Sequence, residues 1–138
     1  MELAARVLNQ RRYLIADAPA ALESHVLGAF QGPRCAGFVR YLVQVIGADV
    51  GRPAVVHDGA ALTEGYFEAF GVDPAFRRQG IGTALQARAI EHCRSLRCHQ
   101  MRSRSPVTSP ENYALKIAAG YVLHPSESND SYYFLLHL

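Results

Sequence analysis

The chain has 138 residues, a length that suits one domain with a buried core of its own, and we expect a single domain over residues 1–138. Hydrophobic residues make up 49% of it and the formal net charge is only +2, so neither disorder nor a nucleic-acid-binding surface is indicated. No apolar run approaches the ~20 residues that a membrane-spanning helix needs, so we expect no membrane partner.

The first residues predict a short helix over positions 1–13, because Leu3, Ala4 and Val7 recur at helical spacing. The acidic Glu2 precedes the first arginines, which is the wrong order for a signal peptide. Three cysteines, an odd number, suit a reducing compartment. We therefore expect a cytoplasmic protein.

The next segments predict a run of strands. Residues 24–30 and 35–46 should form a hairpin around the Gln31-Gly32-Pro33-Arg34 turn, followed by a loop over residues 47–60. A third strand should cover residues 62–72, which are rich in aromatic and β-forming residues. Asp73-Pro74 should end this strand, because proline cannot continue a hydrogen-bonded ladder.

A helix is predicted from Ile81 to about Arg97, with Ile81, Ala84, Leu85, Ala89, Cys93 and Leu96 on one face. A strand over residues 100–105 and a second helix should follow. Ser109 would cap that helix, Gly120 would end it, and the residues expected to face inward are Tyr113, Ala114, Ile117 and Ala118. Residues 121–123 and 132–138 should close the chain as a hairpin.

The start of the first long helix carries an anion-binding signature. Gly80 and Gly82 remove side-chain bulk where the first helical N–H groups lack internal partners, and Arg77 and Arg78 add positive charge. A phosphate or pyrophosphate is the expected ligand. A P-loop is excluded because the only lysine is Lys116, and a dinucleotide-binding fingerprint is excluded because Leu85 stands where its third glycine belongs.

The remaining pattern is Arg77-Arg78-Gln79-Gly80-Ile81-Gly82, preceded by Val72-Asp73-Pro74. It closely resembles the coenzyme-A-binding motif of the GNAT superfamily of N-acetyltransferases. The resemblance extends over residues 24–138 and implies an α/β (α+β) fold with a central mixed, mostly antiparallel sheet flanked by helices. The part ahead of the hairpin is shorter than is usual in the family, so the substrate-covering part is expected to be reduced or completed by another subunit.

The resemblance also implies the cosubstrate, acetyl-CoA, and its contacts. The backbone N–H groups of Arg78, Gln79, Gly80, Ile81, Gly82 and Thr83 would wrap the pyrophosphate, and Arg77 is also among the expected cofactor-binding residues. Phe70, Gly71 and Val72 would pair with the pantetheine arm, and the Val72 N–H would polarise the thioester carbonyl. The asparagine that usually begins the later helix is found at Asn112 rather than at Ser109, a departure from the family pattern, and Asn112 is included among the expected cofactor-binding residues.

For catalysis, glutamates near position 68 often accept the amine proton in the family, usually through water. Glu68 is the first choice and Glu64 the second, because both share one face of the strand; a solvent-facing glutamate without a role is the alternative. The family's acid is often a tyrosine four residues before the glycine that ends the later helix, but here Lys116 occupies that position. Tyr113, one turn earlier, is the candidate acid, or else a core residue.

The expected function is therefore direct transfer of an acetyl group from acetyl-CoA to a primary amine of a small molecule or peptide. The alternative is a non-catalytic acyl-CoA-binding or regulatory domain. No metal site is expected, because His92, Cys93, Cys98 and His99 match no common zinc-ligand spacing. A homodimer is an expected assembly, on the grounds of the short front and an exposed final strand.

Overall fold

A computed structural model describes residues 2–6, 10–108 and 110–138. Its helices are α1 (Glu2–Arg6), α2 (Arg11–Leu14), α3 (Ile81–Ser95) and α4 (Pro110–Ala118), with short 3-10 turns η1 (Ala48–Val50) and η2 (Pro74–Phe76). Its strands are β1 (Glu23–Gln31), β2 (Arg34–Val45), β3 (Val56–His57), β4 (Ala60–Ala61), β5 (Thr63–Val72), β6 (Gln100–Pro106), β7 (Val122–Pro125) and β8 (Ser131–His137).

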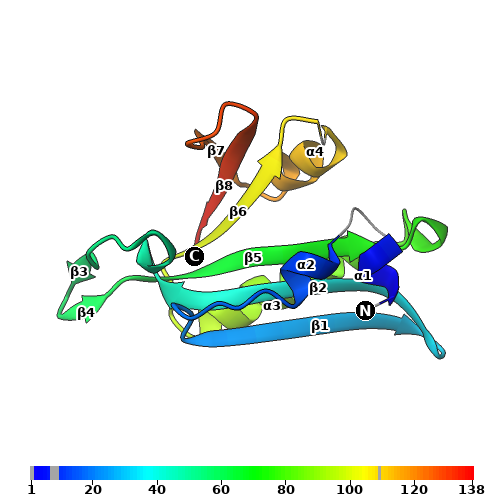
Figure 1. Ribbon diagram of the computed structural model, residues 1–138, viewed down its shortest axis with the longest axis horizontal. Helices are drawn as coiled ribbons and strands as arrows, with labels where there is room; N and C mark the ends of the chain where they lie inside the picture. The colour runs from blue at the N-terminus through cyan, green and yellow to red at the C-terminus, as the bar shows by residue number, and fades with distance from the viewer. Residues whose placement is uncertain (1, 7–9, 109) are drawn as a thin grey trace.

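Six of the strands form one sheet in the order β1-β2-β5-β6-β8-β7, while β3 and β4 form a small separate hairpin (Figure 1). Within the large sheet, only β5 and β6 pair in parallel. The predicted central mixed, mostly antiparallel sheet flanked by helices is confirmed.

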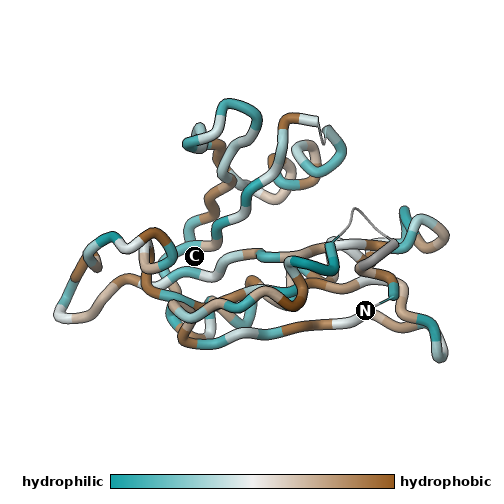
Figure 2. Tube along the Cα trace, in the orientation of Figure 1, coloured by the Kyte–Doolittle hydropathy of each residue, from teal (hydrophilic) through white to brown (hydrophobic). Residues whose placement is uncertain are grey.

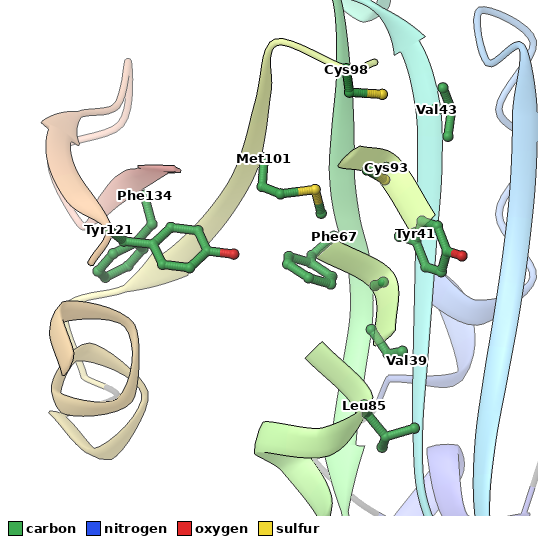
Figure 3. Packing of buried hydrophobic residues seen from close by; sticks show 11 residues of the cluster. Val39, Tyr41, Val43, Phe67, Leu85, Cys93, Cys98, Met101, Tyr121 and Phe134 are labelled. Carbon is green, nitrogen blue, oxygen red and sulfur yellow. The ribbon is translucent and has the colours of Figure 1, made fainter. Parts of the chain in front are cut away.

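The larger core lies between α3 and one face of the sheet. Val39, Tyr41 and Val43 alternate along β2 and pack with Phe67 of β5 against the helix (Figure 3). The buried residues that α3 contributes include Leu85, Ala89 and Cys93. The predicted apolar face of this helix is therefore correct at its centre, whereas Ala84 and Leu96 are exposed.

A smaller core covers the opposite face of the sheet. Leu3 and Ala4 of α1 pack on Phe38 of β2 and Ala69 of β5. Where one helix was predicted, α1 and α2 form two short ones, and residues 7–9 of the predicted helix lie outside the described residues. Helices thus cover both faces of the strands β2 and β5.

Three expectations are corrected by the structure. The segment predicted as a plain loop, residues 47–60, contains η1, β3 and the start of β4. Ala114, Ile117 and Ala118 are exposed, and the buried residue of α4 is instead Lys116. Because helical periodicity assigns a lysine to the solvent side, the prediction placed the inward face of α4 at the wrong residues. Strand β8 lies between β6 and β7, so the final strand is not an exposed edge.

The polar segments fall where the sequence suggests. The β1–β2 turn and the loop between β7 and β8 are hydrophilic (Figure 2), and α4 is followed by Gly120 with a φ of 93°, a helix stop that favours glycine. The predicted cap, Ser109, lies outside the described residues. Among the residues that are described, no helix has the length and apolar character needed to cross a membrane.

Candidate active site

Strands β5 and β6 pair only at their beginnings. Their register covers Glu64 with Gln100, Gly65 with Met101 and Tyr66 with Arg102, after which the strands diverge (Figure 1). The divergence coincides with a bulge in β5, because Arg40 of β2 pairs with Ala69 and the next residue, Tyr41, pairs with Phe67. Glu68 is the extra residue of this bulge. The second half of β5 therefore has an edge that β6 does not cover.

The backbone direction along this edge follows from one hydrogen bond. The Asp73 N–H donates to the Ala36 carbonyl of β2 at 2.8 Å. In an antiparallel ladder, neighbouring residues direct their N–H groups to opposite sides of the strand. The N–H groups of Val72 and Phe70 therefore point away from β2, toward the opening between β5 and β6.

The loop after β5 is fixed by Asp73, which is only 3% exposed. One carboxylate oxygen accepts the Ala75 N–H at 2.9 Å, so that Asp73 caps the η2 turn, and the other accepts from the Arg34 guanidinium at 3.1 Å. The Arg34 guanidinium also lies 4.9 Å from the centre of the Phe76 ring. The Val-Asp-Pro sequence thus makes a rigid turn that aims the chain at the start of α3.

Two residues of the following loop are in the left-handed region, Arg78 with a φ of 64° and Gly80 with a φ of 76°. Gly80 is the N-cap of α3 and provides no side-chain cap, while the first helical bond runs from Ala84 N–H to the Gly80 carbonyl at 2.9 Å. The N–H groups of the first turn lack helical acceptors. Together with the exposed Arg77 and Arg78 they form a positively polarised, anion-accepting surface.

Gly82 is required by packing rather than by backbone conformation. A Cβ atom at this position would lie 2.9 Å from Cζ of Phe70 and 3.3 Å from Cγ2 of Val72. The absence of a side chain therefore lets the start of α3 rest directly on β5. On the other side of the loop, Gln31 donates to the Gln79 side-chain oxygen at 2.9 Å.

Glu68 is half-buried beside the bulge, and burial raises the pKa of its carboxyl group, with Arg40 acting in the opposite direction and Asp49 in the same one. No hydrogen bond or ion pair joins this carboxylate to another residue within the described part of the chain. Its oxygens are therefore available to accept a proton.

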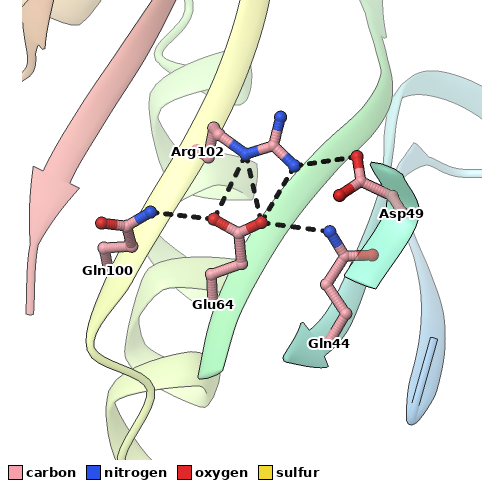
Figure 4. A network of polar contacts seen from close by, with 5 residues as sticks. All are labelled: Gln44, Asp49, Glu64, Gln100 and Arg102. Atoms are coloured by element: carbon pink, nitrogen blue, oxygen red, sulfur yellow. Dashed lines mark hydrogen bonds and ion pairs between the residues drawn. The ribbon is translucent and has the colours of Figure 1, made fainter. Parts of the chain in front are cut away.

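Glu64 has a structural environment instead. It is fully buried, and both oxygens receive hydrogen bonds from Arg102, at 2.9 to 3.2 Å, while Gln44 and Gln100 donate at 3.1 and 2.9 Å (Figure 4). Arg102 also donates to Asp49 at 3.0 Å and covers the Tyr66 ring at 4.3 Å. The Glu64 carboxylate is thus buried and engaged by these donors, whereas the Glu68 carboxylate is not, so Glu68 remains the first choice for the base.

Tyr113 and Asn112 of α4 both contact Ser105 of β6. The Tyr113 hydroxyl donates to the Ser105 carbonyl at 3.0 Å, and the Asn112 amide donates to the Ser105 hydroxyl. The Tyr113 ring packs edge to face on Phe134 at 4.8 Å, and burial raises the pKa of its phenol. Both residues therefore lie on the β6 side of the opening.

Lys116 is a functional candidate whose inward position was not predicted from the sequence. Its side chain is 2% exposed, and its ammonium nitrogen lies 4.3 Å from the centre of the Phe67 ring on β5 and 4.5 Å from that of Tyr121. Burial lowers the pKa of Lys116 to about 7. The side chain thus bridges α4 and β5 across the gap that β6 leaves. Its place four residues before Gly120 was the one signal that could have indicated this position.

Comparison with known proteins agrees with this geometry. A family model described as the acetyltransferase (GNAT) family matches residues 4–116. No curated protein matches the chain.

Solved structures with the same fold include Arabidopsis thaliana NAA60 in complex with a bisubstrate analogue, with a TM-score of 0.68 and 16% identity over 83% of this chain and 75% of that chain. The GNAT domain of S. lividans PAT gives a TM-score of 0.67 and 20% identity over 94% and 68% of the two chains. PaiA N-acetyltransferase from Thermoplasma acidophilum, in complex with coenzyme A, gives 0.65 and 13% identity over 85% and 62%. At these identities the similarity establishes the fold alone.

Proposed function

Since the chain belongs to the acetyltransferase (GNAT) family, we propose that it moves an acetyl group from acetyl-CoA to a primary amine of a small molecule or peptide. The observation that carries this proposal is the uncovered edge of β5, which leads directly into the left-handed loop before α3. A free strand edge suits the amide groups of a pantetheine arm, and a helix start suits a pyrophosphate.

In this proposal, the strand holds the acetyl end of acetyl-CoA and the loop holds its phosphates. Phe70, Gly71 and Val72 pair with the pantetheine arm, and the Val72 N–H polarises the thioester carbonyl. The side chains of Arg77 and Arg78 add charge, while Asn112 contributes from the α4 side. The pyrophosphate is held by the backbone N–H groups of Arg78, Gln79, Gly80, Ile81, Gly82 and Thr83. Bound coenzyme A in the T. acidophilum PaiA structure supports the choice of cosubstrate.

Glu68 is the proposed general base. It takes a proton from the substrate ammonium, directly or through water, and the freed amine attacks the thioester carbonyl carbon. The carbon–nitrogen bond forms and the carbon–sulfur bond breaks. The nitrogen then loses a second proton while the departing thiolate gains one, so the only net proton released is the one that Glu68 has taken. The raised pKa of Glu68 suits a base that must take a proton from an ammonium group.

Tyr113 is the proposed acid for the thiolate, and its hydroxyl would have to leave the Ser105 carbonyl in order to serve. Lys116 is the second candidate, because its ammonium group would be an acid with a pKa of about 7 next to the β5 ring of Phe67. Comparing Tyr113→Phe with Lys116→Met separates them. The variant of the true acid should lose rate with thioester substrates while keeping its affinity for coenzyme A.

A non-catalytic acyl-CoA-binding or regulatory domain is the second candidate function. It is favoured by the engaged hydroxyl of Tyr113 and by Lys116 at the position where the family often has a tyrosine. This alternative predicts binding of acetyl-CoA without turnover on any amine.

Calorimetric titration with acetyl-CoA, compared with ATP and NAD, tests the binding step. Arg78→Gly is a suitable variant because it removes the charge and also relieves a φ of 64°. We expect it to weaken binding about tenfold, the loss of one charge-assisted phosphate contact. Arg88→Ala, at an exposed position within α3, is the control for loss of an arginine outside the loop and should bind as the parent does. Absence of acetyl-CoA binding in the parent protein would overturn the proposal.

Turnover is tested with a panel of peptides and small amines, by following released thiol. Arabidopsis thaliana Naa50 has been solved in complex with the bisubstrate analogue CoA-Ac-MVNAL, which makes peptide N-termini the first acceptors to try. Glu68→Gln should lower the rate strongly with little change in acetyl-CoA affinity. Binding without turnover across the panel would favour the non-catalytic alternative. A homodimer is part of the proposal as well, and light scattering during size-exclusion chromatography would test it.

A further inference from the structure

A second group of functional side chains lies away from the opening between β5 and β6. Glu23 and His25 of β1 and His92 of α3 each offer one ligand atom, and these atoms lie within 4.8 Å of one another. His92 is in the last turns of α3, about three helical turns beyond the loop at Gly80. We propose that Glu23, His25 and His92 form a binding site for one divalent transition-metal ion of the Zn²⁺ class.

The scaffold places these three side chains on one face. Glu23 and His25 are two residues apart on β1, so both point to the same side of the sheet. In the register with β2, His25 is opposite Tyr41, and their rings stack with centroids 5.2 Å apart. The His92 ring meets the His25 ring edge to face at 4.7 Å. Helix α3 therefore presents His92 to the same side of β1.

A further residue orients one of the proposed ligands. The Tyr41 hydroxyl lies 2.7 Å from Nδ1 of His92, and Tyr41 is almost fully buried. When Nδ1 carries the proton, it donates to the Tyr41 oxygen and leaves the lone pair of Nε2 available. Metal-binding histidines generally have such a partner on the second ring nitrogen, which fixes both ring orientation and tautomer.

The donor set and the spacing suit such an ion. Two imidazoles and one carboxylate are ligands that Zn²⁺ and its first-row neighbours accept, with water in the remaining positions. Tetrahedral ligands at about 2.0–2.1 Å from a metal lie about 3.3 Å apart, and Nε2 of His25 is already 2.8 Å from the Glu23 carboxylate. The side chains of His25 and Glu23 are 35% and 43% exposed, so both can rotate until their ligand atoms and that of His92 lie at this tetrahedral separation.

The other histidine and cysteines near this end of α3 make contacts that do not involve the proposed site. His99 packs on the His137 ring at 5.1 Å, and Cys93 and Cys98 are buried in the core. No spacing along the sequence indicates the three proposed ligands, because β1 and α3 are far apart in the chain. A metal at this point would join the edge strand β1 to α3, and its binding would not depend on acetyl-CoA.

The experiment uses the full chain without a histidine tag, freed of metal by a chelating resin. Titration with Co²⁺, followed by its visible absorption and then by displacement with Zn²⁺, should saturate at one equivalent. Glu23→Gln and His25→Asn, two changes at partly exposed positions, should each weaken binding at least tenfold. His124→Ala, an exposed histidine on β7, is the matched control and should leave affinity unchanged.

Tyr41→Phe tests the orienting contact and should weaken metal binding between tenfold and a hundredfold, the range found for loss of such partners. The melting temperature without metal shows whether each variant keeps its fold. Failure of the parent to reach saturation at one equivalent would overturn the proposal. Equal metal affinity in the parent, Glu23→Gln and His25→Asn would overturn it too, by placing the ion elsewhere. None of these outcomes depends on acetyl transfer.

Discussion

Replacement of Lys116 by methionine tests how the buried cation is accommodated. Lys116 is 2% exposed, and its neighbours are the rings of Phe67 and Tyr121 rather than a carboxylate. Methionine has a similar length and flexibility but no charge to desolvate. We therefore expect Lys116→Met to raise the free energy of unfolding at neutral pH, which is unusual for a substitution at a buried position.

The size of the gain follows from the pKa. Burial lowers the pKa of Lys116 from 10.5 to about 7. A difference of about 3.5 units, at 1.36 kcal/mol each, corresponds to roughly 5 kcal/mol for the fully protonated group, and to roughly 4 kcal/mol at pH 7. The two ring contacts favour the cation by about 1 kcal/mol each. The net gain expected for Lys116→Met at pH 7 is therefore about 2 to 3 kcal/mol.

The effect of Lys116 on folding stability changes with pH in a direction that follows from its lowered pKa. Between pH 7 and 10.5 the unfolded chain binds a proton at Lys116 that the folded protein has released, so the stability of the parent protein rises with pH in this window. The cost of burial is fully present below pH 7 and disappears as pH approaches 10.5. The advantage of Lys116→Met should accordingly be largest at low pH and shrink on the alkaline side.

Urea unfolding of both proteins between pH 6 and 10 measures this difference. Because the chain has a single lysine, labelling with ¹³C- or ¹⁵N-lysine gives one side-chain signal, whose NMR titration reports the Lys116 pKa directly. A titration midpoint in the ordinary range for lysine, about 10, would refute the reasoning. A loss of stability in Lys116→Met at pH 7 would refute it as well.

Three further changes are expected to have clear effects. Arg102→Met leaves the Glu64 carboxylate buried without its cation and should lower stability by about 3–5 kcal/mol in urea unfolding, whereas a near-neutral result would refute the view that this buried ion pair supports the fold. Gly82→Ala forces a Cβ against Phe70, so a melt should show a loss of about 1–3 kcal/mol. If Glu68 is the base, its raised pKa shifts the acid limb of kcat/KM upward from the usual range for glutamate, and Glu68→Gln should remove that limb; a limb that persists belongs to another group.

Much of the fold was predictable because its patterns are local. Backbone sterics restrict where strands and helices can end, and these restrictions act on neighbouring residues. They account for the turn at 31–34, the end of β5 at Asp73-Pro74 and the glycine after α4. Apolar residues at spacings of three and four placed the centre of α3 correctly. The start of the chain was less predictable, because its two short helices are stabilised by packing on Phe38 and Ala69 rather than by their own periodicity.

The candidate site divides in the same way. The loop from Arg77 to Thr83 was predictable because its glycines and arginines are consecutive in the chain. The surroundings of Glu64 and Lys116 were not predictable, because each of them contacts residues that are distant in sequence. From the sequence Glu64 is expected at the surface, whereas the β5–β6 pairing places Arg102 beside it. From the sequence Lys116 is also expected at the surface, whereas α4 directs its side chain toward the Phe67 ring.

The position of the Glu64 and Arg102 pair gives it a role in shaping the opening. The pairing of β5 and β6 extends only over Glu64 to Tyr66, and Arg102 contacts both of these residues while also covering the Tyr133 ring of β8 at 5.1 Å. Burial alone would lower the pKa of Arg102, but the bonds and charge of Glu64 outweigh it and raise that pKa, so the guanidinium stays charged. The network thus joins β5, β6 and β8 at the point where the strands begin to part. The last contacts that β5 and β6 share before they diverge are thus a buried, multiply bonded ion pair, which lies beside the bulge that carries Glu68.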